Sequence, residues 1–231
     1  MRIRWDERAS AAQIAAMAAQ IDTAGYCRID GFVSSDELES LARIGEAAVQ
    51  RNGGEYVALT GLEGFAGSVW EMFSASPALR HVCEQLYRHF TGAPAKSSGF
   101  HQVFRCLKGK SVKGHSLYFH FDSYVITILV PILIPQTRLS GELILFPARR
   151  PIRKSWWRNV LDKLVMELPT SQLFYRLRAD ARQSPAVSVA LAPGSAIVFC
   201  GYRSLHTNSR PDPDLLRVTG LLHYGNPHRQ L

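Results

Sequence analysis

The stretch YVITILVPILI at residues 124–134 is a long apolar run with the β-branched composition of a buried strand. A shorter run, GELILFP at 141–147, follows it behind a turn glycine. Two more runs of this kind lie further along, PGSAIVFC at 193–200 and LRVTGLLHY at 216–224. Strands that alternate with turns predict a jelly roll, the double-stranded β-helix built from two antiparallel sheets.

Helices are predicted on the N-terminal side of these strands. Residues 9–24 place apolar side chains on one face and end at Gly25, and a second helix at 36–50 follows Ser34 or Ser35 as its cap. A third helix begins at Pro77 and runs to about residue 90. We therefore expect a mainly β protein with α-helices, formed as a single domain over residues 1–231. Its parts are a helical N-terminal part at about 1–95, a jelly roll at about 98–226 and a basic helical insertion at about 150–182.

Three potential metal ligands lie within the strand pattern. In a β-strand, residues i and i+2 point to the same side, so a strand over 116–121 would direct both His120 and Asp122 toward one ion. His206 comes from a later strand, 84 residues after Asp122. Two histidines and one carboxylate can occupy one face of a six-coordinate metal and leave the opposite positions open, as in non-haem Fe(II) oxygenases.

An arginine that could bind a carboxylate follows the last of these potential ligands in the sequence. Arg217 lies 11 positions after His206, and a planar guanidinium binds a carboxylate through two parallel hydrogen bonds. Such a pair suits the distal carboxylate of 2-oxoglutarate. The keto-acid end of this cosubstrate and then O2 would take the open metal positions. Thr219 shares the strand face of Arg217 and could donate to the same carboxylate.

The order of these motifs resembles the phytanoyl-CoA dioxygenase-like branch of the Fe(II)/2-oxoglutarate oxygenases. GYCRIDGFVSSDEL at 25–38 is similar to the opening strand, turn and helix start of that branch. The chain departs from it at FPARR, residues 146–150, where the family usually carries a Pro-Gly-Ser-His-like turn. The resemblance implies Fe(II) on His120, Asp122 and His206, and 2-oxoglutarate on Arg217. It also implies polar contacts to the cosubstrate from Gln102 and Thr127, on neighbouring strands.

Other polar residues in the same region have plainer interpretations. Tyr118 shares the face of His120 and could contact substrate or cosubstrate, but it could equally be a core tyrosine. Gln102 and Thr127 could be polar residues on solvated strand faces. Asn208 and Arg210 are candidates for contacts around the metal site or with substrate. Isolated histidines are usually core or surface residues, and we interpret three in this way: His101, His115 and His223.

The positive charge of the chain is concentrated in one segment. The formal net charge is +8, and residues 149–182 contain nine basic residues against three acids, beside Trp156 and Trp157. Aromatic and aliphatic residues surrounded by Lys and Arg predict a surface-binding helix. Its partner would be an anionic membrane, an acidic carrier protein, or a phosphorylated or CoA-linked substrate. In the alternative, the apolar face covers the barrel and the basic face is solvated. Nucleic acid is not favoured, because no nucleic-acid module accompanies the charge.

Composition limits the location of the protein. No apolar run approaches the length of a membrane span, and the charged first residues do not form a signal peptide. The four cysteines are widely spaced, so structural disulfides are not expected and a reducing compartment fits. We therefore expect a cytoplasmic protein, peripheral at the membrane if the basic segment binds lipid.

The motifs favour an enzyme over its alternatives. The expected activity is hydroxylation of an unactivated C–H bond in a small, lipid-like or carrier-bound substrate, with release of succinate and CO2. Asp122 supports this reaction, because related halogenases carry a small residue at that position. One alternative is a non-catalytic, cupin-like binding module that keeps the metal site. Another is a cupin-type hydrolase or isomerase, against which Arg217 speaks because such an enzyme needs no carboxylate clamp.

Overall fold

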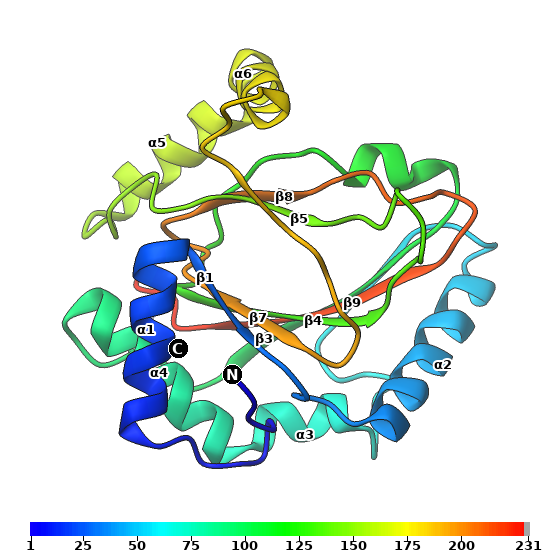
Figure 1. Ribbon diagram of the computed structural model, residues 1–231, viewed down its shortest axis with the longest axis horizontal. Helices are drawn as coiled ribbons and strands as arrows, with labels where there is room; N and C mark the ends of the chain where they lie inside the picture. Colours follow the sequence, from blue (N-terminus) through cyan, green and yellow to red (C-terminus); the bar gives the residue numbers. More distant parts are fainter. Residues whose placement is uncertain (229–231) are drawn as a thin grey trace.

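The computed structural model describes residues 1–228, in which two antiparallel sheets face each other as the layers of a sandwich (Figure 1). This arrangement confirms the jelly roll predicted from the strand pattern. The larger sheet has the order β1 (Tyr26–Ile29), β7 (Ala196–Phe199), β4 (Ile126–Leu133), β9 (Arg217–Tyr224), β3 (Phe100–Leu107) and β2 (Val57–Thr60). The smaller sheet has the order β6 (Val187–Val189), β5 (Leu143–Phe146) and β8 (Leu205–Asn208).

The N-terminal helices cover the outer face of the larger sheet (Figure 1). They are α1 (Ala11–Ala24), α2 (Ser35–Arg51), α3 (Val69–Ala75) and α4 (Pro77–Thr91). Ser10 and Ser34 each form a capping box with the residue three positions on, which stabilises the starts of α1 and α2. Their apolar faces and the outward face of the sheet form the main hydrophobic core.

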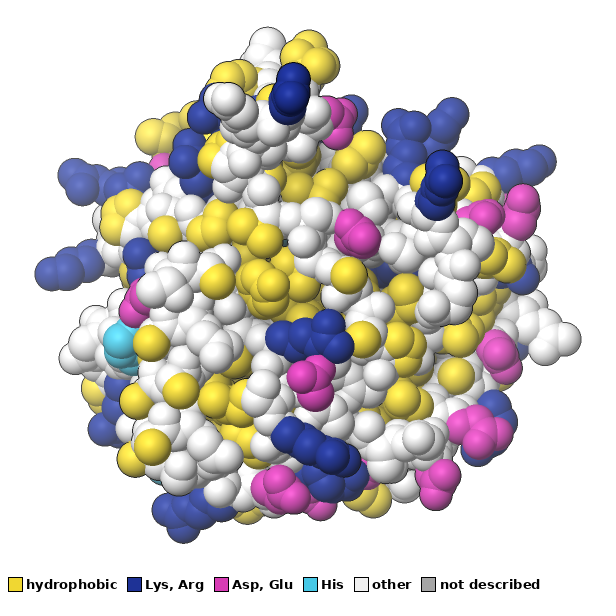
Figure 2. Space-filling view, viewed as in Figure 1, with side chains coloured by type: hydrophobic (Ala, Val, Ile, Leu, Met, Phe, Trp, Pro, Cys, Tyr) yellow, Lys and Arg dark blue, Asp and Glu magenta, His cyan; other side chains and the backbone are white. Residues whose placement is uncertain are grey.

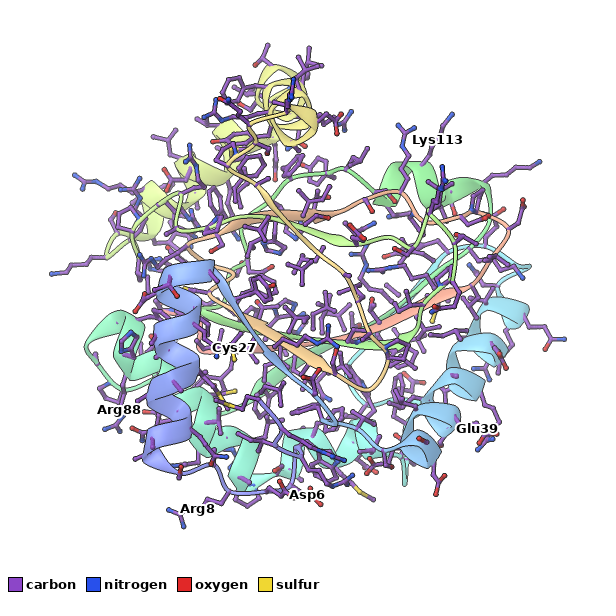
Figure 3. The ribbon with its side chains drawn as sticks, viewed as in Figure 1. Asp6, Arg8, Cys27, Glu39, Arg88 and Lys113 are labelled. Atoms are coloured by element: carbon purple, nitrogen blue, oxygen red, sulfur yellow. The ribbon has the colours of Figure 1, made fainter. Side chains whose placement is uncertain are left out.

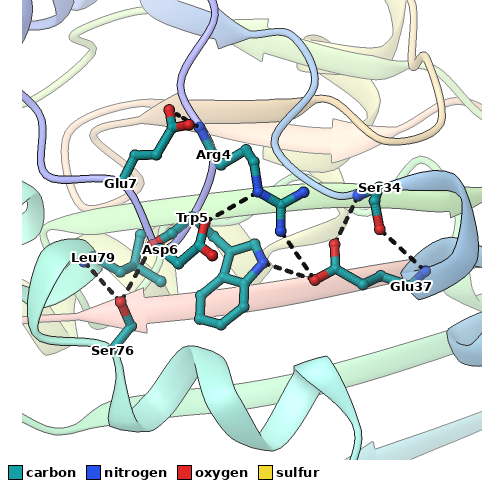
Figure 4. A network of polar contacts seen from close by, with 8 residues as sticks. All are labelled: Arg4, Trp5, Asp6, Glu7, Ser34, Glu37, Ser76 and Leu79. Carbon is teal, nitrogen blue, oxygen red and sulfur yellow. Dashed lines mark hydrogen bonds and ion pairs between the residues drawn. The ribbon is translucent and has the colours of Figure 1, made fainter.

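The N-terminal segment ties the starts of two helices together (Figure 4). The Glu37 carboxylate accepts hydrogen bonds from the Ser34 backbone at 2.7 Å and from the Trp5 indole at 3.2 Å. Ser76, at the start of α4, accepts from the Leu79 backbone and donates to the Trp5 carbonyl at 3.2 Å. This network braces the helical side of the larger sheet and leaves the inner face of the sandwich for other side chains.

The basic insertion forms two helices, α5 (Trp156–Glu167) and α6 (Pro169–Asp180), which lie on the side of the smaller sheet (Figure 1). Proline cannot continue a helix, so α5 ends before Pro169 and this residue begins α6. No helix within residues 1–228 is long and apolar enough to cross a membrane.

Several parts of the structure differ from the sequence predictions. The strand predicted at 116–121 is not regular, because Leu117 adopts a left-handed conformation with φ of 55°. The segment stays beside β8 through one isolated bridge between His120 and His206. Strand β2 and helix α3 were not predicted.

Candidate metal centre

The two histidines of the predicted triad face each other across an antiparallel pair. The backbone of His120 donates to the His206 carbonyl at 3.0 Å, and the His206 backbone donates back at 3.1 Å. The centroids of the two rings are 4.4 Å apart. Asp122 follows two residues later, and its backbone donates to the Gly201 carbonyl at 3.1 Å. These hydrogen bonds fix both sides of the site through the backbone.

The three side chains converge closely enough to hold one ion. Their candidate ligand atoms all lie within 4.8 Å of one another. The Asp122 carboxylate is 3.8 Å from Nε2 of His120 and 3.5 Å from Nε2 of His206. Asp122 and His206 are buried, whereas the His120 side chain keeps 43% of its surface exposed and marks the open side. The geometry therefore brings the predicted ligands together.

The hydrogen bonds of the imidazoles determine which nitrogen is free for a metal. Nδ1 of His120 lies 3.1 Å from the Tyr118 carbonyl, and Nδ1 of His206 lies 3.0 Å from the Ser204 carbonyl. A carbonyl only accepts, so each Nδ1 carries a proton and donates it. In the neutral imidazole the Nε2 lone pair is then available, and both Nε2 atoms face the carboxylate. Second contacts of this kind are typical of metal-binding histidines.

The carboxylate of Asp122 is held in place by neighbours of the larger sheet. Thr127, on β4, donates its hydroxyl to Asp122, and Nδ1 of His223, on β9, lies 3.1 Å from the same hydroxyl. Burial raises the pKa of Asp122, but the adjacent His206 and His223 outweigh it and hold the pKa well below its ordinary value. The carboxylate is thus ionised, as a metal ligand requires.

Gly201 leaves room for this carboxylate. A Cβ atom at that position would collide with the Thr127 hydroxyl and lie 2.9 Å from Cγ of Asp122. The glycine is therefore needed for close approach of the backbone to the site.

The three candidate ligands line a cavity between the two sheets, and Arg217 lines the same cavity. The Arg217 side chain is buried there without an acidic partner among the described residues. Its side chain is 2% exposed, its Nε donates to the Gly141 carbonyl at 3.1 Å, and one terminal nitrogen donates to the Thr219 hydroxyl at 3.3 Å. Within residues 1–228, no carboxylate lies within ion-pair distance of this guanidinium. Burial, with a smaller contribution from Arg105, lowers its pKa to about 9. A buried, unpaired cation is costly, so an anionic ligand would stabilise this site.

The same cavity contains two residues that the sequence analysis did not select. Arg105 lines it from β3, directly opposite Thr219 on β9, and donates to the His115 carbonyl at 3.2 Å. His223 lines it from β9. Strand periodicity contained the signal for His223, because positions 217, 219, 221 and 223 share one face and all four line the cavity. The cavity is completed by an apolar wall, formed by Leu129, Leu143, Phe199 and Leu221.

The remaining candidate residues differ in their position relative to the cavity. The predicted contact of Gln102 with the cosubstrate does not agree with its position. Its amide donates to the Trp70 carbonyl at 2.7 Å, on the helix-covered face of the sheet, and Gln102 does not line the cavity. Thr127 contacts Asp122 rather than the cavity. Tyr118 is 42% exposed and stacks beside His120. Asn208 lines the cavity and donates to Ser116, whereas Arg210 is exposed.

Solved structures share this fold. A prolyl-4-hydroxylase of Pseudomonas putida is 13% identical, with a TM-score of 0.59 over 92% of this chain and 98% of its own. HygX of Streptomyces hygroscopicus, with nickel and 2-oxoglutarate bound, is 16% identical with a TM-score of 0.57 over 91% and 86%. The epimerase SnoN in complex with Fe3+, alpha ketoglutarate and nogalamycin RO is 13% identical with a TM-score of 0.57 over 94% and 85%.

At these identities the likeness establishes the fold. Its members differ in reaction, so the fold leaves the chemistry to be argued from the site. No protein-family model matches the chain, and no curated protein matches its sequence.

Replacing Thr127 by valine should weaken metal binding while leaving the fold intact. Valine keeps the shape of the side chain but removes the hydroxyl that orients Asp122. Loss of such an outer contact typically costs roughly 10–100-fold in metal affinity. Titration with Fe(II) or Co(II) would measure the change, and Thr127→Ser, which retains the hydroxyl, should restore most of the affinity. Equal affinities for the valine variant and the wild type would show that the hydroxyl does not position the carboxylate.

Proposed function

We propose that this protein is an Fe(II)- and 2-oxoglutarate-dependent dioxygenase. It would hydroxylate an unactivated C–H bond of a small, lipid-like or carrier-bound substrate and release succinate and CO2. The observation that carries the proposal is the buried, unpaired guanidinium of Arg217 in the same cavity as the His120, Asp122 and His206 cluster. A metal-binding cluster alone is compatible with many reactions. The buried guanidinium of Arg217 narrows the choice, because it requires an anionic ligand in the same cavity as the metal.

The side chains have separate roles in this proposal. His120, Asp122 and His206 would hold Fe(II), which together with 2-oxoglutarate supplies the activation of O2. Arg217 would pair with the distal carboxylate of the cosubstrate, and the Thr219 hydroxyl, now bonded to Arg217, would sit beside the same carboxylate. Thr127 and His223 would keep Asp122 oriented.

The apolar wall of the cavity has its own function in the proposal. Leu129, Leu143, Phe199 and Leu221 line the site and limit the number of water molecules around the reacting groups. Exclusion of water strengthens the pairing between Arg217 and an anion. The open side at His120 is where the substrate would approach.

One feature supports hydroxylation rather than halogenation, and a second supports the phytanoyl-CoA dioxygenase-like branch. Asp122 is present, so no metal position is left to chloride. The segment 25–38, similar to the opening of that branch, forms β1 and the capped start of α2. The departure at 146–150 lies at the end of β5, where Arg150 turns inward and donates to the Tyr202 carbonyl at 2.7 Å.

Anaerobic addition of Fe(II) and then 2-oxoglutarate tests the proposal without knowledge of the substrate. We expect one Fe(II) per chain and a weak visible absorption band that appears only with 2-oxoglutarate. On exposure to air, slow formation of succinate should follow, because many enzymes of this chemistry turn over without substrate. Binding of both ligands without any succinate, even with candidate substrates, would favour the non-catalytic binding module. Absence of the band would contradict the assignment of the cosubstrate.

A further inference from the structure

Helices α5 and α6 present apolar side chains to solvent. Trp157 is 73% exposed, Leu161 is 61% exposed and Leu177 is 64% exposed. Figure 2 shows hydrophobic side chains on the surface over these helices, with Lys and Arg projecting beside them. Apolar surface of this extent on a folded protein usually marks a binding surface. The exposed apolar residues of the two helices, named the outer face below, are Trp156, Trp157, Leu161, Leu164, Val165, Leu168, Leu173, Phe174 and Leu177.

Several polar side chains of the two helices make contacts on the inner side. Asp162 accepts from Arg150 at 3.2 Å and from Arg153 at 2.8 Å. Nζ of Lys163 donates to the Ser123 hydroxyl at 2.6 Å. The fully buried residues of the two helices are the polar residues Asn159 and Gln172 and one apolar residue, Met166. Met166 and Tyr175 also pack against Phe119 and Phe146, but the larger apolar side chains of the two helices lie on the exposed side.

The inner contacts attach both helices to the segment that carries the metal ligands. Gln172 accepts from the Phe119 backbone at 2.9 Å and donates to its carbonyl at 2.8 Å. Arg176 donates to the Leu117 carbonyl at 2.9 Å. The segment 117–123 contains His120 and Asp122, so the two helices are held in a fixed position relative to the segment that carries these metal-ligand candidates.

Unpaired positive charge surrounds the outer face. Arg150 and Arg153 are paired with Asp162, whereas the other basic residues of the segment form no ion pair with the described part of the chain, residues 1–228. Two exposed acids, Glu167 and Asp180, oppose them. The exposed basic residues are Arg149, Lys154, Arg158, Arg176, Arg178 and Arg182. A partner must therefore be apolar at its centre and anionic around it.

We propose that the outer face docks on the surface of an anionic lipid bilayer. Tryptophan, leucine and phenylalanine on one face, flanked by Lys and Arg, are the composition of helices that lie in the interface of a membrane. The apolar residues lie on the outward sides of two helices, which suits a broad surface. The basic residues would interact with lipid phosphates, each contributing roughly a fivefold gain in binding near an anionic surface.

Docking narrows the substrate class, an extension that rests on the proposed function. The attachment of α5 and α6 to residues 117–123 would hold the segment that carries His120 and Asp122 close to the bilayer. The substrate would then be an amphiphile taken from the membrane, with its chain entering the apolar part of the cavity.

Sedimentation with vesicles tests the docking independently of catalysis. We expect the wild-type protein to bind vesicles of phosphatidylcholine and phosphatidylglycerol at low salt, and to bind phosphatidylcholine alone much more weakly. Combined replacement of Arg158, Arg178 and Arg182 by glutamine should weaken binding roughly a hundredfold at low salt. The matched control replaces three exposed basic residues elsewhere, Arg8→Gln, Arg51→Gln and Lys113→Gln, and should bind as the wild type does. Lys113 projects from the 3-10 helix η1 (Lys110–His115), away from α5 and α6 (Figure 3).

A second pair of variants tests the apolar part. Leu161→Gln with Leu164→Gln should also weaken vesicle binding. The control Met72→Gln with Leu139→Gln replaces exposed apolar residues outside the outer face and should not weaken it. Failure of the wild type to bind anionic vesicles at low salt would overturn the proposal. Binding to an acidic carrier protein in place of vesicles, or self-association through the outer face, would also overturn it. Succinate formation from 2-oxoglutarate is measured in solution, so loss of docking and loss of the proposed activity are distinguishable.

Discussion

The variant His206→Ala should lose both Fe(II) binding and the conversion of 2-oxoglutarate to succinate. His206 supplies one of only two imidazoles in the cluster, and its Nε2 lies 3.5 Å from the Asp122 carboxylate. Removal of an outer contact already costs roughly 10–100-fold in metal affinity, and loss of a ligand should cost more. Metal analysis after gel filtration and the anaerobic visible band would measure the effect. A variant that retains full activity would contradict the assignment of the metal centre.

The control for this variant separates loss of metal from loss of fold. His81→Ala removes a histidine from α4, outside the cavity, and should bind Fe(II) normally. The backbone pair between residues 120 and 206 does not depend on the imidazole, so the far-ultraviolet circular dichroism of His206→Ala should match that of the wild type.

The variant Arg217→Ala should bind Fe(II) normally but bind 2-oxoglutarate at least about 30-fold more weakly. The guanidinium is buried, and its hydrogen bonds go to the Gly141 carbonyl and the Thr219 hydroxyl rather than to the predicted metal ligands. Removing one partner of a buried, hydrogen-bonded charge pair costs roughly 2–5 kcal/mol. Calorimetric titration of the Fe(II)-loaded protein with 2-oxoglutarate, without oxygen, would measure the loss.

Two further variants locate the carboxylate contact. Arg217→Lys should recover part of the affinity, because lysine supplies the charge without the paired donors of the guanidinium. If Arg217→Ala leaves the affinity unchanged, the cosubstrate must pair elsewhere. Arg105 is then the residue to replace, since it is the other arginine that lines the cavity.

Local signals predicted the elements that depend on local structure. Ser34 caps α2 and Gly25 ends α1 with φ of 87°, because these signals act within one helical turn. The long strand at 124–134 appeared as β4, since its apolar run is buried on both faces. Strand β2 was missed because it lies at the edge of the sheet, where its alternating exposure leaves only a weak pattern.

The site was less predictable where it depends on which face of a strand is turned inward. Gln102 and Arg105 lie on the same strand with an odd separation, so they point to opposite faces of the sheet, and only the structure assigns the cavity to Arg105. Likewise, the apolar pattern of residues 156–167 predicted helix α5 but not which of its sides faces the rest of the protein. The polar contacts of Asp162 and Lys163, made with residues far along the chain, determine that orientation.

The reciprocal hydrogen bonds between His120 and His206 mean that the spacing of the chain matters as much as its chemistry. The pair is made by backbone atoms, so the two imidazoles are already neighbours in the folded chain before any ion arrives, and little further ordering is required of them. The same arrangement is intolerant of a change in length. One residue inserted between His120 and Asp122 would break their alternation and turn Asp122 away from the side that His120 faces. Evolution can therefore vary the side chains around this cavity more freely than the number of residues in the segment that forms its edge.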